Sequence, residues 1–137
     1  MYKRQRGGSL DYALMGYTMM AVQSFAHQLG ISRFKTRLTI RMHHQFAMAS
    51  DGTEGLCSPQ DDPRHFIVDV CLYGNWLATL AHEMVHVKQY LRKEINYSLS
   101  KWKGKDGFED VGYWEQPWEI EARKLQMKLV TEFDRLS

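Results

Sequence analysis

Two histidines four residues apart flank a glutamate in the segment NWLATLAHEMVHVKQYL, residues 75–91, as His82, Glu83 and His86. On a helix, side chains at positions i and i+4 lie about 6 Å apart on one face, so His82 and His86 can bind one metal ion. Zinc accepts such a pair and needs a third protein ligand, and a catalytic zinc site keeps a fourth position for water. Glu83 can reach that water without displacing a ligand. The spacing therefore predicts one bound Zn²⁺ with Glu83 as a general base.

The two histidines lie off the apolar face of this predicted helix. On a helical wheel the large apolar side chains gather on one side, roughly opposite His82 and His86. These apolar residues are Trp76, Leu77, Leu80, Met84, Val87 and Leu91. The histidine side also carries Ala78, Thr79 and Gln89, and it lacks the Lys and Glu of a face turned to bulk water. Such a face fits the wall of a cleft, and the alternative is two histidines with ordinary hydrogen bonds on a helix.

The third metal ligand has to come from another segment. Downstream of His86 there is neither His nor Cys, so an acidic residue must serve unless the ligand lies upstream. The upstream alternatives are His43, His44, His65, Asp61 and Asp62. Downstream, YWEQPWEIEARKLQMKLV predicts a helix with Pro117 in its first turn and with Glu119 and Glu121 as candidate ligands. Its inward stripe would be Trp118, Ala122, Leu125, Leu129 and Phe133.

The motif HEMVH, followed by a separate helix carrying EIEA, resembles the gluzincin branch of the zincin metallopeptidases, in particular its minimal single-domain members. The resemblance covers residues 75–125. It implies that His82, His86 and Glu119 bind the metal, that Ala122 is the small residue of a Glu-x-x-Ala element, and that Glu83 is the general base.

The activity that this resemblance implies is zinc-dependent hydrolysis of peptide bonds. Zinc acidifies the bound water and polarises the carbonyl, and Glu83 passes the water's proton to the leaving amine. Tyr113 is the candidate oxyanion donor, with Tyr90, Tyr97 and His43 as alternatives. The Asp that often follows the Glu-x-x-Ala element in the family is Arg123 here, so another residue would have to bond to a ligand histidine.

The segments around the motif predict the elements that position it. Ser9 is a plausible N-cap of a first helix that Gly30 ends. Alternating apolar residues predict strands in KTRLTIRMHH (residues 35–44) and RHFIVDVCL (residues 64–72), and QFAMA (residues 45–49) is a candidate third strand. SPQDDPR is expected as a loop. The implied fold is α/β (α+β) and zincin-like: an N-terminal helix, a small twisted mixed sheet of three or four strands, the active-site helix and the glutamate helix.

Composition predicts one globular unit without special partners. The chain has 137 residues with a net charge of +2, and 44% of its residues are hydrophobic. We expect a flexible basic tail over residues 1–8 and a single metallopeptidase domain over residues 9–137. The small net charge calls for neither a nucleic acid nor a membrane surface. Residues 96–113 predict a long loop, either a lid or wall of the cleft or a simple surface loop.

Three functional hypotheses follow from these observations. The first is a cytoplasmic zinc metallopeptidase that binds a peptide or protein in extended form, because no apolar run is long enough for a membrane span or a signal peptide. The second is a zinc-stabilised protein-interaction module without activity, in one version associated with DNA through its basic loops. The third is a protein without metal. Glu83 favours the first, because a purely structural site has no use for a base beside an open coordination position.

Overall fold

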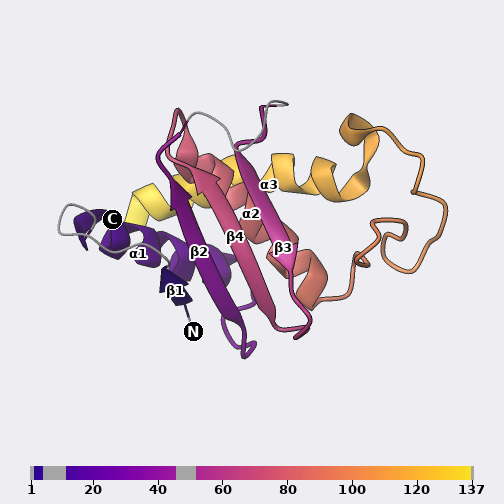
Figure 1. Ribbon diagram of the computed structural model, residues 1–137, viewed down its shortest axis with the longest axis horizontal. Coiled ribbons are helices and arrows are strands. Elements are labelled where there is room, and N and C mark those ends of the chain that lie inside the picture. Colours follow the sequence, from indigo (N-terminus) through magenta and orange to yellow (C-terminus); the bar gives the residue numbers. More distant parts are fainter. Residues whose placement is uncertain (1, 5–11, 46–51, 137) are drawn as a thin grey trace.

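Three helices lie on one face of a four-stranded sheet in the computed structural model, which describes residues 2–4, 12–45 and 52–136 (Figure 1). The strands are β1 (Tyr2–Arg4), β2 (Arg37–His43), β3 (Gly55–Pro59) and β4 (His65–Cys71), and the helices are α1 (Tyr12–Gln28), α2 (Trp76–Leu91) and α3 (Pro117–Leu136). The strand order is β1-β2-β4-β3, and only β3 is antiparallel to its neighbour among these strands. The predicted mixed α and β class, with a small mixed sheet, is confirmed.

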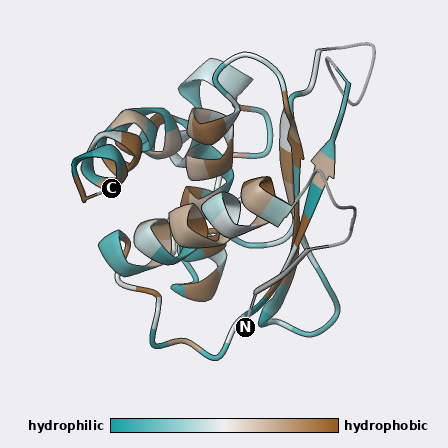
Figure 2. Ribbon diagram, turned by 90° about the vertical axis from the view of Figure 1, so that its left-hand side faces the viewer, coloured by the Kyte–Doolittle hydropathy of each residue, from teal (hydrophilic) through white to brown (hydrophobic). Residues whose placement is uncertain are grey.

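Strands β2 and β4 form because apolar side chains alternate with polar ones in both. Leu38, Ile40 and Met42 of β2 are buried, as are Phe66, Val68 and Val70 of β4. The parallel register pairs Leu38 with Phe66, Ile40 with Val68 and Met42 with Val70, so both apolar faces point to the same side. Figure 2 shows the helices on one side of the sheet, and these strand residues belong to the same buried core as residues of α1, α2 and α3. The two strands predicted from alternation are confirmed.

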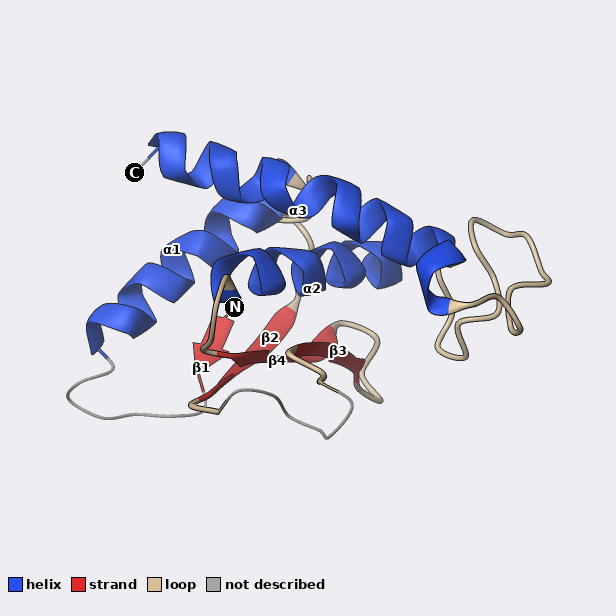
Figure 3. Cartoon of the chain, turned by 90° about the horizontal axis from the view of Figure 1, so that it is seen from above, coloured by secondary structure: helices blue, strands red, loops and turns tan. Residues whose placement is uncertain are grey.

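Helix α2 begins at its predicted cap, because the side chain of Asn75 accepts a hydrogen bond from the amide of Ala78 at 3.4 Å. It lies between the sheet and α3 (Figure 3) and contacts β3, β4, α1 and α3. Its apolar residues Leu80, Met84 and Val87 are fully buried. Because neighbours cover most of its circumference, Glu83, His86 and Gln89 on its other face are buried too, whereas Thr79 and His82 are half-buried. The predicted helix is confirmed.

Helices α1 and α3 also follow their sequence signals. Gly30 has a φ of +72°, a left-handed conformation that suits glycine, and α1 ends two residues before it at Gln28. The predicted N-cap Ser9 lies outside the described residues. Helix α3 starts at Pro117, as predicted, and its buried residues are Trp118, Ala122, Leu129, Val130 and Phe133, with Leu125 partly buried. This stripe packs α3 against α2 and α1.

Two segments differ from the sequence predictions. Gly55–Pro59 forms β3 and pairs with β4 through contacts such as Cys57 with Val68, whereas the sequence predicted a loop from Ser58 onward and no element for residues 55–57. Its sequence GLCSP has no alternating pattern, so the strand depends on backbone pairing with β4. Tyr2–Arg4, expected within a loose tail, pairs in parallel with β2 at Leu38–Ile40. The predicted strand QFAMA falls almost entirely outside the described residues.

The long segment between α2 and α3 contains no strand or α-helix, as predicted, apart from the short 3-10 turn η2 (Tyr113–Glu115) that precedes α3. An isolated antiparallel bridge joins Ile95 to Trp102. Figure 3 shows this segment extending beyond the amino-terminal end of α3. No helix in the described residues has both the length and the hydrophobicity needed to cross a membrane.

Candidate metal centre

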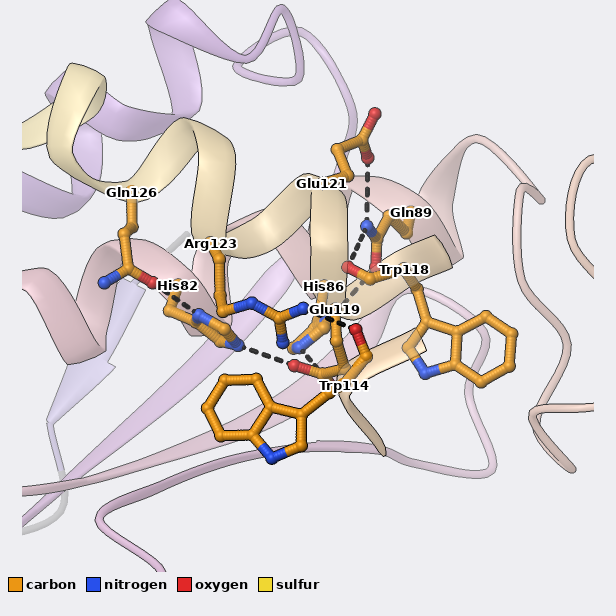
Figure 4. A network of polar contacts seen from close by, with 9 residues as sticks. All are labelled: His82, His86, Gln89, Trp114, Trp118, Glu119, Glu121, Arg123 and Gln126. Carbon is orange, nitrogen blue, oxygen red and sulfur yellow. Dashed lines mark hydrogen bonds and ion pairs between the residues drawn. The ribbon is translucent and has the colours of Figure 1, made fainter. Parts of the chain in front are cut away.

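Three potential metal-binding side chains converge between α2 and α3. His82 and His86 come from α2 and Glu119 comes from the first turn of α3. The Nε2 atom of His82 lies 2.8 Å from Oε1 of Glu119, and the Nε2 atom of His86 lies 3.1 Å from Oε2 of the same carboxylate. One ligand atom from each residue lies within 4.8 Å of the other two. Figure 4 shows both rings and the carboxylate pointing toward one another.

The other ring nitrogen of each histidine faces a glutamine oxygen. Nδ1 of His82 lies 2.6 Å from Oε1 of Gln126, and Nδ1 of His86 lies 2.8 Å from Oε1 of Gln89. Nε2 of Gln89 donates to the carbonyl of Trp118 at 3.0 Å and to Glu121 at 2.9 Å, which fixes its oxygen toward His86. The Nδ1 of His86 must therefore be the donor. These contacts leave the Nε2 atoms of both rings for the shared site.

This hydrogen-bond pattern creates a need for positive charge. If both rings donate from Nδ1, their neutral forms direct Nε2 lone pairs at the Glu119 carboxylate, and only a proton or a metal cation makes those contacts favourable. Burial alone would lower the pKa of His86, but the hydrogen bond to Glu119 and the charges of Glu83 and Glu119 raise it to about 9. Burial would raise the pKa of Glu119, but hydrogen bonds from His82 and His86 hold it well below its usual value.

The donor set and its spacing fit Zn²⁺. Zinc binds imidazole nitrogen and carboxylate oxygen at about 2.0 to 2.2 Å, which separates neighbouring tetrahedral ligand atoms by about 3.4 Å. The ring nitrogens of His82 and His86 lie 2.8 and 3.1 Å from different oxygens of the Glu119 carboxylate, and one ligand atom from each of the three residues lies within 4.8 Å of the other two, which is close to this spacing. His82, His86 and Glu119 could therefore hold one zinc ion with small side-chain adjustments.

Glu83 lies on α2 between the two histidines and is 7% exposed. Its pKa is raised, chiefly because burial disfavours the charged form, and the nearby His86 and His82 oppose this in part. A Cβ atom added to Gly55 of β3 would stand 3.0 Å from Oε2 of Glu83 and 2.5 Å from Cγ2 of Thr79. The glycine thus lets β3 pass close to the Glu83 carboxylate. A buried carboxylate with a raised pKa suits a general base.

A cleft of about 920 Å³ opens at this site, and His82, Glu83, His86 and Glu119 all line it. Residues 52–57, which include the first half of β3, form part of its wall. Leu99 and Tyr113 of the long loop (residues 96–113) line it as well, as does the preceding Ile95. The loop therefore contributes to the cleft wall, and its role as a lid stays a prediction.

The structure also places the candidate oxyanion donors. Tyr113 of η2 lines the cleft, and burial, together with the charge of Glu119 and a hydrogen bond to it, raises its pKa to about 12. Tyr90 lines the cleft too, whereas Tyr97 is 60% exposed and its ring is tilted against that of Tyr90 at a centroid distance of 5.8 Å. His43 is not among the cleft residues, and it contacts Asp69 at 2.7 Å.

The alternative metal ligands have other contacts. Glu121 binds Nζ of Lys88 and the amide of Gln89, both at 2.9 Å. Among the upstream candidates, His65 contacts Arg37 and Thr39, and Asp62 accepts from the amide of Arg64. Among the described residues, the group of three potential ligands contains none of the upstream alternatives, His43, His44, His65, Asp61 and Asp62.

The sequence interpretation did not identify three residues that shape the site: Gln89, Gln126 and Gly55. Gln89 is fully buried, and a Gln on a helix face without Lys or Glu was the available signal. Gln126 and Glu119 are seven residues apart, two turns of α3, so they share one face. No sequence signal marked Gly55, because its contact depends on how β3 crosses α2.

Comparisons with protein-family models, with curated proteins and with solved structures find no match to this chain.

Proposed function

We propose that the protein is a zinc-dependent metallopeptidase of the gluzincin type, with a zincin-like fold. One observation carries this proposal: two histidines and a glutamate from two helices converge in an open cleft, with a buried glutamate beside them. A structural zinc site has four protein ligands and is closed. Here three protein ligands, an open cleft and an adjacent base together favour hydrolysis.

His82, His86 and Glu119 would hold the ion, and Gln126 and Gln89 would orient the two rings. Bound zinc lowers the pKa of a water molecule and polarises a carbonyl oxygen. Glu83 accepts the proton of the attacking water and then donates it to the leaving nitrogen. Tyr113, which lines the cleft, would donate a hydrogen bond to the developing oxyanion.

The substrate is proposed to be a peptide segment in extended form. Strand β3 is the last strand of the sheet, paired on one side with β4, and residues 55–57 line the cleft. An extended segment can add to such an edge through main-chain hydrogen bonds. The edge then directs the bound backbone past Glu83 and the metal ligands.

The first test is the metal content of the purified protein and of four variants. The wild type should carry one equivalent of zinc, and His82→Ala and His86→Ala should lose it. Glu119→Gln should weaken zinc binding much more than the matched change Glu121→Gln, because Glu121 contacts Lys88 and Gln89. Competition with a chromogenic chelator measures these affinities. Equal losses in the two glutamine variants, or a full equivalent of zinc in either alanine variant, would place the metal elsewhere.

The second test separates an enzyme from a binding module. Glu83→Gln keeps the size of the side chain and removes the base, so zinc content should be retained while peptide cleavage falls at least about a hundredfold. Cleavage is followed by mass spectrometry of an unbiased peptide library. Unchanged cleavage would remove Glu83 from the mechanism. A zinc-loaded wild type that cuts no peptide would favour the protein-interaction module over the enzyme. A cytoplasmic location stays a prediction.

A further inference from the structure

An arginine reaches into the cleft from the same face of α3 as the proposed metal ligand. Arg123 follows Glu119 by four residues, a rise of about 6 Å along the helix, and it lines the cleft. Figure 4 shows Gln126, Arg123 and Glu119 descending together from α3 toward His82 and His86. This position brings a permanent positive charge beside the bond that the proposed reaction would cleave.

The guanidinium of Arg123 is held in place but is not neutralised. Its Nη2 donates to the carbonyl of Trp114 at 2.8 Å, and its Cζ lies 4.8 Å from the centroid of the Trp114 ring and 5.8 Å from that of Tyr113. Among the described residues, no carboxylate lies within ion-pair distance of Arg123. Its Nη1 is buried and has no hydrogen-bond partner in this part of the chain.

A buried donor without an acceptor costs free energy, and a ligand that supplies the acceptor recovers it. The guanidinium group presents its donors as a planar fork, which matches the two oxygens of a carboxylate. Each residue of an extended chain spans about 3.3 to 3.6 Å, so about 6 Å corresponds to one or two residues from the metal ligand. The anion that fits is therefore a carboxylate close to the scissile bond.

We propose that Arg123 binds a substrate carboxylate within two residues of the cleaved bond. This carboxylate is either the C-terminal carboxylate of a peptide or the side chain of Asp or Glu, and the proposal rests on the proposed function. The peptidase would thus prefer substrates with an acidic group beside the cleavage site. Of these two sources, the C-terminal carboxylate would make the protein an enzyme that trims peptide ends.

Four sets of short peptides test this proposal on the zinc-loaded, full-length protein. They share one sequence library, with either a free C-terminal carboxylate or an amide, and with either Glu or Gln flanking the cleaved bond. Wild-type kcat/KM should be at least about tenfold higher for one acidic set than for its neutral counterpart, and Arg123→Gln should abolish that difference. Arg123→Lys keeps the charge without the fork and should retain an intermediate preference. The acidic set whose kcat/KM exceeds that of its neutral counterpart identifies the source of the carboxylate.

A purely structural role for Arg123, such as holding η2 through Trp114, predicts equal losses for acidic and neutral peptides. That result would overturn the proposal, as would a wild type that has no preference for either acidic set. The wild-type kcat/KM values for acidic and neutral peptides test the preference without any variant. A variant that folds poorly therefore leaves this test intact.

A binding measurement separates this proposal from the proposed peptidase activity. Calorimetry with zinc-loaded Glu83→Gln measures the affinity of the same four peptide sets without turnover. Binding that favours an acidic set and is lost in Glu83→Gln/Arg123→Gln supports the carboxylate site even if the wild type cleaves nothing. If the acidic and neutral sets bind equally, or if neither binds at millimolar concentration, the carboxylate site is wrong.

Discussion

At the scale of single residues, the hydrogen bonds behind the histidines decide how the site can be used. The side-chain oxygen of Gln126 lies 2.6 Å from Nδ1 of His82, on the opposite side of the ring from Glu119. Gln126→Leu removes this oxygen while it keeps a side chain of similar size. Zinc affinity should fall by about tenfold to a hundredfold, as is typical when such an outer partner is lost. Competition with a chromogenic chelator measures the change.

The matched control for this prediction is Gln23→Leu on α1, where the side chain is exposed and is not part of the cleft. It should leave zinc affinity unchanged. A Gln126→Leu variant that binds zinc as tightly as the control would show that Gln126 does not orient His82.

The raised pKa of His86 predicts a pH dependence of stability in the metal-free protein. The pKa is about 9 in the folded chain and 6.5 in an unfolded one, so protonated His86 stabilises the fold by up to about 3 kcal/mol. This contribution is fully present below pH about 6.5 and is lost as the pH rises through about 9. Urea unfolding of the EDTA-treated protein between pH 6 and pH 9.5 should show this loss.

His86→Gln is the control for the pH dependence, because it retains a polar side chain that does not titrate. Its free energy of unfolding should vary much less over the same pH range. An equally steep profile in His86→Gln would assign the effect to another group.

At the scale of elements, the close passage of β3 over α2 makes Gly55 sensitive to substitution. In Gly55→Ala the new Cβ would stand 2.5 Å from Cγ2 of Thr79 and 3.0 Å from Oε2 of Glu83. The strand or the Glu83 side chain must move, so we expect a loss of about 1 to 3 kcal/mol in the free energy of unfolding and a lower kcat. Thr79→Ser removes Cγ2, and in the double variant it should restore part of the stability.

Gly16 provides the matched control for Gly55. It is exposed in α1, and nothing lies within 4 Å of an added Cβ. Gly16→Ala should therefore stabilise the protein by about 0.5 to 1 kcal/mol. If Gly55→Ala also raises the free energy of unfolding in chemical denaturation, then β3 does not pass close to Thr79 and Glu83 of α2.

The elements differ in how far their sequences predicted them. Strands β2 and β4 and helices α1, α2 and α3 have strong periodicity or clear caps such as Asn75, Gly30 and Pro117. Strand β3 has neither, because its five residues GLCSP pair through backbone groups that any sequence offers. Prediction failed where long-range backbone pairing, which leaves no local pattern, forms the element.

The candidate site was partly predictable for a similar reason. His82, Glu83 and His86 share one helix, so their spacing alone predicted their proximity. Glu119 needed the approach of a second helix, and the preference for Glu119 over Glu121 came from the resemblance and from the position of Glu119 in the first turn of that helix. The glutamines that orient the rings could not be predicted, because a hydrogen bond between side chains depends on rotamers and on the packing of α2 against α3.

At the scale of the whole molecule, the metal should not be needed for folding. The buried core contains apolar residues from α1, β2, β4, α2 and α3, and none of the three candidate ligands belongs to it. The EDTA-treated protein should therefore keep its far-UV circular dichroism. Added zinc should raise the free energy of unfolding by about 2.7 kcal/mol at a hundredfold excess over Kd. A metal-free chain without helical signal would contradict this view of the core.

Because the candidate ligands are divided between two helices, the site would also limit how fast a bound zinc ion escapes. If α3 opens away from α2, the ion keeps His82 and His86 but loses Glu119, and its dissociation accelerates. The residence time of zinc should then report on the opening of α3. Phe133, near the far end of α3, packs on Phe25 and Tyr17 at centroid distances of 5.9 and 5.4 Å. Phe133→Leu, which touches no ligand, should therefore shorten the lifetime of the bound metal in chelator-capture kinetics.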